Sequence, residues 1–229
     1  MDIIMKIAAL GDSIIKGVLF TQEENGRGHY SLSDHNILYH IAEYLKCETI
    51  NLGKIGCTIS AGERILERQA ENFKDVKYAL LCYGGNDSDY DWNAIANNPT
   101  ADHLPRTSLS VFEKTYARIV DKVRNMGCVP VILSMPPMNS EVYFEHICKH
   151  LNPNQKKNLL KWLKGSTDTI WAGHELYNDA VKRVAAETDT MIIDLTTALL
   201  RQKNYLCEDG IHPNNNGYQI IAKSILSVI

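Results

Sequence analysis

Short, almost continuously apolar runs alternate with longer amphipathic stretches along this chain. The apolar runs lie at residues 5–10, 49–52, 78–83, 129–134 and 191–195. Runs of this length without polar alternation are typical of strands that are buried on both faces. The amphipathic stretches lie at residues 35–45, 61–73, 109–126, 173–187 and 215–228. The alternation predicts an α/β fold, a three-layer α/β/α sandwich with a five-stranded parallel sheet.

The size and charge of the chain limit what it can be. Its 229 residues, 45% of them apolar, are enough for one domain of ordinary size spanning residues 1–229. The 24 basic and 27 acidic residues give a net charge of −3 without a basic run, so we expect no nucleic-acid partner. No apolar run reaches the roughly 18 residues of a transmembrane helix, so we also expect no membrane span.

The start of the chain and its cysteines bear on location. Residues 1–10 carry Asp2 and Lys6 and continue into a polar motif, so we expect a strand there and not a cleaved signal. The six cysteines form no CxxC pair, and several lie within apolar segments. Such cysteines are typical of reduced thiols, which predicts a cytoplasmic protein.

Two segments near opposite ends of the chain carry the side chains of a serine hydrolase. Ser13 follows the first predicted strand, and Asp209 and His212 precede the last predicted helix. A serine hydroxyl needs an imidazole to take its proton and a carboxylate to orient that imidazole. Because Asp209 lies three residues before His212, one tight turn can bring its carboxylate to the imidazole Nδ1.

The polar motifs all fall where a parallel sheet binds its ligands. Ser13 follows the first predicted strand, residues 53–58 follow the second, and residues 84–87 follow the third. Ligands of open parallel sheets bind outside the carboxyl ends of the strands. Each motif taken alone can be an ordinary turn. Their common placement predicts that they meet at one edge of the sheet.

With these motifs the chain resembles the SGNH hydrolases, also called the GDSL family of esterases and lipases, over essentially its whole length. The matching segments are Gly11-Asp12-Ser13-Ile14, residues 51–58, Gly84-Gly85-Asn86-Asp87 and Asp209-Gly210-Ile211-His212-Pro213. Isoleucine replaces the leucine of the family name, and Cys57 stands where the family more often has a polar residue. The resemblance implies the flavodoxin-like SGNH hydrolase fold and a serine esterase.

The resemblance also implies a role for each matching residue. Ser13 is the expected nucleophile, His212 its general base, and Asp209 the carboxylate that holds His212. The backbone N–H groups of Ser13 and Gly56 and the side-chain amide of Asn86 correspond to the oxyanion hole. This chemistry needs no metal and no organic cofactor, so we expect neither.

The segment 134–172 follows the fourth predicted strand and is longer than a minimal fold of this kind needs. Apolar residues between Leu159 and Leu163 predict a helix within it. Long connections are often lids or binding loops. We therefore expect an insertion near the active site that forms one wall of the acyl or alcohol pocket. The alternative is a helix that packs only on the core or on a second copy of the chain in a homo-oligomer.

Polar and aromatic residues near the motifs are candidate substrate contacts. Tyr90 and Trp92 lie in the segment 89–106, directly after Asn86, and packing of a surface loop is the alternative interpretation. The candidate contacts are Asp12, Tyr90, Trp92, Tyr143 and Trp171.

His146 and His150 are four residues apart, a spacing that suits a metal site on a helix. No third ligand follows at a recognisable spacing, so a structural role is favoured.

The partner that follows is a small-molecule acyl ester. We expect short-chain substrates, with acetyl-carbohydrate esters as one class. An acyltransferase or a thioesterase would use the same core residues. A non-catalytic module that binds a sugar or a nucleotide is an alternative from a different class.

Overall fold

A five-stranded parallel sheet forms the centre of the molecule, which was analysed as a computed structural model describing residues 5–24 and 27–229. Its strands follow the order β4-β1-β5-β6-β7, and each neighbouring pair is parallel. The strands are β1 (Lys6–Gly11), β4 (Glu48–Asn51), β5 (Val76–Cys82), β6 (Val129–Leu133) and β7 (Met191–Ile193). All five predicted strands are therefore confirmed. Residues 1–4 of the predicted lead-in to the first strand lie outside the described residues.

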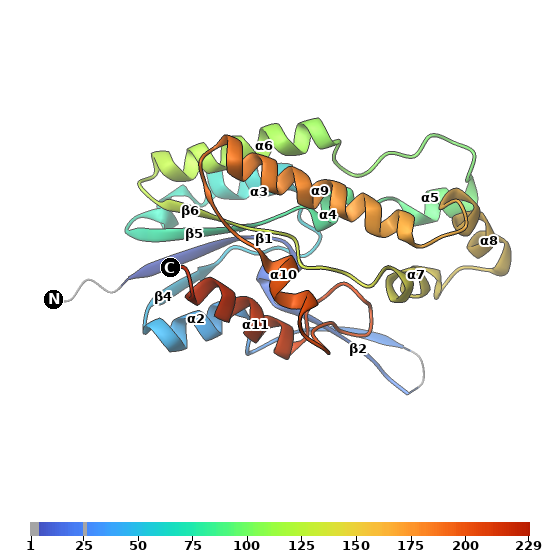
Figure 1. The fold of residues 1–229 in the computed structure, drawn as a ribbon, viewed down its shortest axis with the longest axis horizontal. Helices are drawn as coiled ribbons and strands as arrows, with labels where there is room; N and C mark the ends of the chain where they lie inside the picture. The colour runs from blue at the N-terminus through green and yellow to red at the C-terminus, as the bar shows by residue number, and fades with distance from the viewer. Residues whose placement is uncertain (1–4, 25–26) are drawn as a thin grey trace.

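Helices cover both faces of this sheet (Figure 1), which gives the predicted three-layer sandwich. One layer contains α3 (Ile59–Arg68), α6 (Leu109–Asn125) and α9 (Asp168–Glu187). The other layer contains α2 (Ile37–Leu45), α10 (Leu195–Leu200) and α11 (Asn215–Leu226). Each layer closes its own hydrophobic cluster against one face of the sheet, with Phe112 and Val181 in one and Ile41 and Ile221 in the other.

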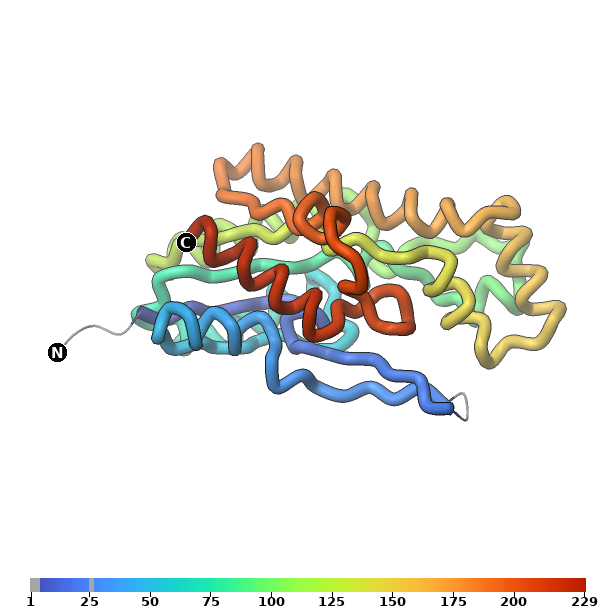
Figure 2. Tube along the Cα trace, turned by 60° about the horizontal axis from the view of Figure 1, so that its bottom comes forward, coloured from blue at the N-terminus to red at the C-terminus, as the bar shows by residue number. Residues whose placement is uncertain are grey.

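The helix boundaries differ from the prediction in two places. The stretch 61–73 is an α-helix that ends at Arg68, followed by the 3-10 turn η1 (Ala70–Phe73). Helix α9 starts at Asp168, five residues before the predicted start at Gly173. The first turn of α9 thus belongs to the segment 134–172, and Figure 2 shows the helix running along most of the length of the molecule.

Several short helices extend the fold beyond the carboxyl ends of the strands. They are α1 (Ser13–Lys16), α4 (Gly85–Ser88), α5 (Trp92–Asn97), α7 (Ser140–Cys148) and α8 (Pro153–Trp162). The last three lie together at one end of the molecule (Figure 1) and form a third hydrophobic cluster around Trp92, Phe144 and Leu159. Helix α8 is the helix predicted within 134–172, and it begins with a capping box between Asn152 and Gln155.

An antiparallel hairpin of β2 (Val18–Gln22) and β3 (Gly28–Leu32) was not predicted. Every residue of β3 is exposed, so this strand buries no face and leaves no apolar pattern in the sequence. The hairpin projects from the sandwich in Figures 1 and 2. Among the helices of the described residues, none combines the length and the apolar character of a membrane span.

Gly62 allows α3 to approach the end of β5. A Cβ atom at this position would overlap the hydroxyl end of Tyr83, whose ring is fully buried and cannot move aside. Alanine normally stabilises a helix interior by about 1 kcal/mol relative to glycine, whereas overpacking a core costs ~1–3 kcal/mol. We therefore expect Gly62→Ala to lower the free energy of unfolding by about 1 kcal/mol, the middle of the net range of these two terms, measured by urea denaturation.

Ala172→Gly, at an exposed site in α9, provides the reference for the alanine preference without a packing contact. A Gly62→Ala protein as stable as the parent chain would contradict the close-approach argument.

Candidate active site

Ser13 stands at the carboxyl end of β1, on the first residue of the one-turn helix α1. Asp12 caps this helix, because its Oδ1 accepts the backbone N–H of Ile14 at 2.9 Å. Gly17 ends the helix with a left-handed backbone, φ 88°. This tight strand-to-helix turn presents the Ser13 hydroxyl at the edge of the sheet, with only 8% of the residue exposed.

Asp209 and His212 lie in the loop between α10 and α11. One oxygen of Asp209 accepts the backbone N–H groups of Ile211 and His212, each at 3.1 Å. Its other oxygen, Oδ2, is 2.6 Å from His212 Nδ1. The three-residue spacing therefore does build one turn in which the carboxylate orients the imidazole.

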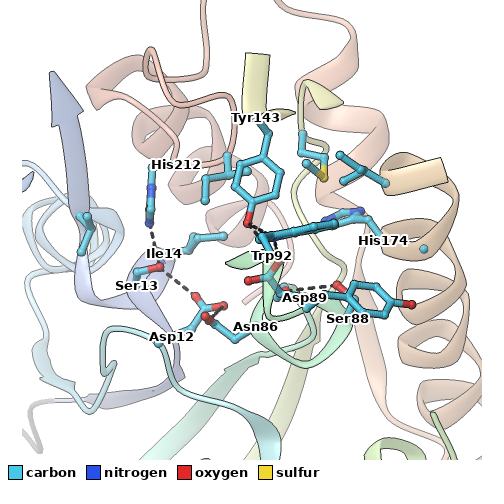
Figure 3. Close-up of a pocket in the computed structure, with 18 of the residues that line it drawn as sticks. Asp12, Ser13, Ile14, Asn86, Ser88, Asp89, Trp92, Tyr143, His174 and His212 are labelled. Carbon is cyan, nitrogen blue, oxygen red and sulfur yellow. Dashed lines mark hydrogen bonds between the residues drawn. The ribbon is translucent and has the colours of Figure 1, made fainter. Parts of the chain in front are cut away.

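The oriented imidazole reaches across to the other end of the chain. His212 Nε2 lies 2.9 Å from Ser13 Oγ, although the two residues are 199 positions apart. Because Nδ1 faces a carboxylate, the ring carries its proton there and Nε2 can accept the Ser13 proton. Figure 3 shows the His212 ring directed at Ser13.

Electrostatics keep Asp209 ionised. Complete burial would raise the pKa of this carboxyl group, but the hydrogen bonds from the His212 side chain and from two backbone N–H groups outweigh it. The pKa of Asp209 is therefore below its ordinary value. A buried carboxylate next to Nδ1 stabilises the imidazolium that forms when His212 takes a proton.

Neighbouring elements brace the Asp209–His212 loop. Gly210 adopts a left-handed backbone (φ 78°) and packs against the start of α7, where Asn139 donates its backbone N–H to the Gly210 carbonyl at 2.8 Å. The edge of the Tyr30 ring, from β3, faces the His212 ring at a centroid distance of 5.8 Å. The sequence analysis missed Tyr30 because the hairpin that carries it shows no hydrophobic pattern.

Asn86 and Gly56 come from the loops after β5 and β4 and line the same cavity as Ser13. The side-chain amide of Asn86 donates one hydrogen bond to Asp12 Oδ2 at 3.2 Å. Because an amide has two N–H groups, its second donor remains available to a ligand. Gly56 has a left-handed backbone (φ 70°), and a Cβ atom there would meet open space. Backbone conformation is thus the reason for this glycine.

Buried polar contacts fix the two loops relative to each other. Both oxygens of Asp87 accept the backbone N–H of Ile59, at 3.0 and 3.1 Å, at the start of α3. Lys54 donates its backbone N–H to the Gly11 carbonyl at 3.1 Å. The Gly56 loop is therefore held from both sides, by the turn that carries Asn86 and by the turn that carries Ser13. The sequence motif included Asp87 but did not indicate this role.

A cavity of about 450 Å³ opens beside Ser13 (Figure 3). Of the candidate substrate contacts, Asp12, Tyr90, Trp92 and Tyr143 line it. Further lining residues were not named individually as candidate contacts, and most of them come from the segment 134–172, which was expected to form a wall, and from α9. They include Tyr30, Met138, Trp162, Ile170, Gly173 and His174.

Trp171, the fifth candidate contact, is not among the residues that line this cavity. It borders a neighbouring shallow hollow together with Asp168. The Trp171 ring stacks on the ring of His174, at a centroid distance of 5.9 Å, and His174 lines the cavity. Trp171 therefore lies next to the cavity wall but does not form part of it.

The structure gives no support to a metal site at His146 and His150. Residues 5–24 and 27–229 contain no group of three or more histidine, cysteine or acidic side chains that could hold a metal ion. His146 Nε2 is instead 3.1 Å from the hydroxyl of Tyr30, and its ring packs on Phe20. His146 therefore has a structural role at the base of the hairpin.

The sequence matches the GDSL-like Lipase/Acylhydrolase family over residues 9–220. A search of curated proteins found no match. Solved structures with the same fold include a lipase/acylhydrolase from Enterococcus faecalis, with 16% identity, a TM-score of 0.67 and coverage of 98% of this chain and 94% of that one. A member of the lipolytic G-D-S-L family from Veillonella parvula has 18% identity, a TM-score of 0.64 and 98% coverage of both chains. An acetylxylan esterase from Geobacillus stearothermophilus has 16% identity, a TM-score of 0.61 and coverage of 99% and 95%.

The buried carboxyl group of Asp87 should make stability depend on pH. Burial raises its pKa to about 6. A carboxyl group whose pKa is raised in the folded state stabilises the fold below its unfolded pKa, near 4, and this contribution disappears as the pH rises through 6. In Asp87→Asn the amide oxygen can still accept the Ile59 N–H. The variant should therefore gain stability relative to the parent between pH 4 and 7, by up to about 3 kcal/mol.

Urea denaturation of both proteins at pH 4, 5, 6 and 7 measures this difference. Groups that do not interact with Asp87 cancel, whereas Asp12, whose charge contributes to the raised pKa of Asp87, loses this repulsion in the variant and adds to the difference in the same direction. A stability difference that does not change with pH would contradict the raised pKa of Asp87.

Proposed function

The chain belongs to the GDSL-like lipase/acylhydrolase family and is an ester hydrolase, and we propose that it cleaves acyl esters through a covalent intermediate on Ser13. The observation that carries this proposal is the unbroken line of hydrogen bonds from Asp209 through His212 to Ser13, with distances of 2.6 and 2.9 Å. It ends on a hydroxyl group that opens into the cavity. This arrangement activates a serine for attack on a carbonyl.

In the first step, His212 Nε2 takes the Ser13 proton while Oγ attacks the ester carbonyl. Asp209 holds the resulting imidazolium. The carbonyl oxygen becomes negatively charged and is stabilised by the backbone N–H groups of Ser13 and Gly56 and by the Asn86 amide. Each of these groups lines the cavity or belongs to a residue that does.

In the second step, the imidazolium gives its proton to the leaving alcohol, and the C–O bond to that alcohol breaks. Water then attacks the acyl-serine, with His212 again as the base, and Ser13 regains its proton as the acid leaves. These residues complete the reaction with side chains and backbone donors alone, which supports the proposal that the enzyme uses no cofactor.

We also propose a class of substrate. Short-chain acyl esters, including acetyl esters of carbohydrates, are the class proposed from the sequence. Two proteins of similar fold are acetylxylan esterases, at 16% and 18% identity, which supports this class. A thioesterase or an acyltransferase would share the acyl-serine step. The intact hydrogen-bonded residues favour all of these over a non-catalytic binding module.

We further propose that residues 1–229 act as one domain in which the insertion 134–172 supplies a wall of the substrate cavity. Met138, Tyr143 and Trp162 of this segment line that cavity, which supports the proposal. A cytoplasmic location is also proposed. All six cysteines lie within the described residues and are free thiols, as expected in a reducing compartment.

Replacing the nucleophile tests the reaction. Ser13→Ala should lower the turnover of p-nitrophenyl acetate at least 1,000-fold, on the order of the losses seen when a catalytic serine is removed. It should also abolish covalent labelling by a fluorophosphonate probe, while the circular dichroism spectrum stays unchanged. Ser110→Ala, at an exposed position in α6, is the matched control. Full turnover or labelling of the Ser13→Ala protein would refute the assignment.

A further inference from the structure

We propose that the cavity beside Ser13 is an acyl pocket for a hydrophobic acyl group of medium length, closed by Trp92 and Trp162 and kept open by Gly173. This inference rests on the proposed esterase function and specifies its substrate. Within the acyl esters it favours acyl groups considerably longer than acetyl, so the acetyl-carbohydrate esters named from the sequence become the competing outcome of the test below.

The polar atoms of Trp92 and Tyr143, which form the aromatic wall of the cavity, are hydrogen-bonded within the protein. The Trp92 Nε1–H and the Tyr143 hydroxyl both donate to Asp89 Oδ1, at 2.7 and 3.0 Å. Arg106 forms an ion pair with the other oxygen of Asp89 at 3.1 Å. Figure 3 shows Trp92 and Tyr143 converging on Asp89. Since these donors are satisfied within the protein, the two rings offer a ligand mainly apolar surface.

The closed end of the cavity is a rigid aromatic cluster. The Trp162 ring contacts those of Tyr90 and Trp92 edge-on, at centroid distances of 5.0 and 6.2 Å. Hydrogen bonds tie the supporting helices together, with Gln155 donating to Asn97 and Asn158 to the Ala96 carbonyl, both at 2.9 Å. The end wall between α5 and α8 is therefore built to keep its shape.

Gly173 lies inside α9, where glycine weakens a helix. A Cβ atom at this position would meet no protein atom within 4 Å. Gly56, Gly127 and Gly165 have equally open surroundings, but each has a left-handed backbone that explains the glycine. Gly173 has no such backbone and lines the cavity. The absence of a side chain at Gly173 therefore leaves room in the pocket.

The direction of the ester bond follows from His212. The leaving alcohol receives its proton from His212 Nε2, so the alcohol must lie on that side of Ser13. Figure 3 shows His212 next to Ser13 on one side of the cavity and Trp92 on the other side. The two sides differ in exposure to solvent. Tyr30, which contacts His212, is 49% exposed, whereas Trp92 is 9% exposed. The alcohol therefore faces the open mouth, and the acyl chain points toward the buried aromatic wall.

The size of the cavity separates acetyl from longer acyl groups. Its volume of about 450 Å³ equals the liquid volume of about 15 water molecules. The methyl group of an acetyl ester would leave most of this apolar surface in contact with water. Each added methylene buried there should raise kcat/KM about fourfold until the chain reaches the end wall.

The test compares p-nitrophenyl acetate, butyrate, hexanoate and octanoate with the parent enzyme and with Gly173→Phe. The parent should prefer hexanoate or octanoate to acetate by at least tenfold in kcat/KM. Gly173→Phe should lower the octanoate-to-acetate ratio at least tenfold, because its ring occupies the chain's space. Ala172→Phe adds the same ring one residue away, at an exposed site, and should leave that ratio unchanged.

A parent enzyme that hydrolyses acetate as well as octanoate would overturn the inference but leave the esterase function intact. Equal ratios in the Gly173→Phe and Ala172→Phe proteins would overturn it as well. If Gly173→Phe does not fold, Trp162→Ala carries the test. Removing the end wall should move the preferred chain beyond octanoate, measured with the decanoate and dodecanoate esters added to the series, and an unchanged preference would refute the proposal.

Binding separates the pocket from the reaction. Calorimetric titration of the Ser13→Ala protein should show octanoate binding at least tenfold tighter than butyrate, independently of turnover. Absence of labelling and turnover in the parent would refute the proposed function, while this titration still decides the pocket. Equal affinities for the two acids would refute the pocket.

Discussion

The common carboxyl edge of the parallel sheet is the constraint on which the rest of this molecule depends. Every strand of the sheet runs in the same direction, so each strand-ending loop emerges at one edge. This is how Ser13 meets His212 across 199 positions of sequence. The core supplies the rigidity, since both faces of the strands are buried under helices. The polar turns at the edge can then be short and still be precisely placed.

Buried carboxyl groups organise this edge, and they do so in two different ways. Asp209 accepts hydrogen bonds from the His212 side chain and from two backbone N–H groups, so its pKa is lowered despite burial. Asp12 and Asp87 are also buried, and burial raises the pKa of both. Of these three carboxyl groups, only Asp209 is stabilised as an anion, and it lies where the positive imidazolium of His212 must form. Asp12 and Asp87 mainly hold Asn86 and the start of α3 in place.

The sequence predicted those features that depend on local pattern. Strands buried on both faces leave continuous apolar runs, so all five were found. The turn of Asp209 and His212 follows from their spacing. The β2–β3 hairpin could not be predicted, because β3 buries no residue. The contact between its Tyr30 and His212 joins residues that are far apart in the sequence. The position of Trp171 depends on where α9 begins. The sequence predicted this start at Gly173, five residues after the observed start at Asp168, so Trp171 was not placed on the helix.

The difference between local patterns and long-range contacts also explains why the cavity is harder to predict from the sequence than the catalytic residues. A catalytic turn is encoded by neighbouring residues, but an apolar cavity depends on how distant polar atoms are satisfied. Trp92 and Tyr143 could each have turned a donor toward a polar substrate. They do not, because both donors form hydrogen bonds to Asp89, and Arg106 forms an ion pair with the same carboxylate. A charged residue thereby creates an apolar surface, and Gly173, which lines the same cavity without a side chain, leaves room beside that surface.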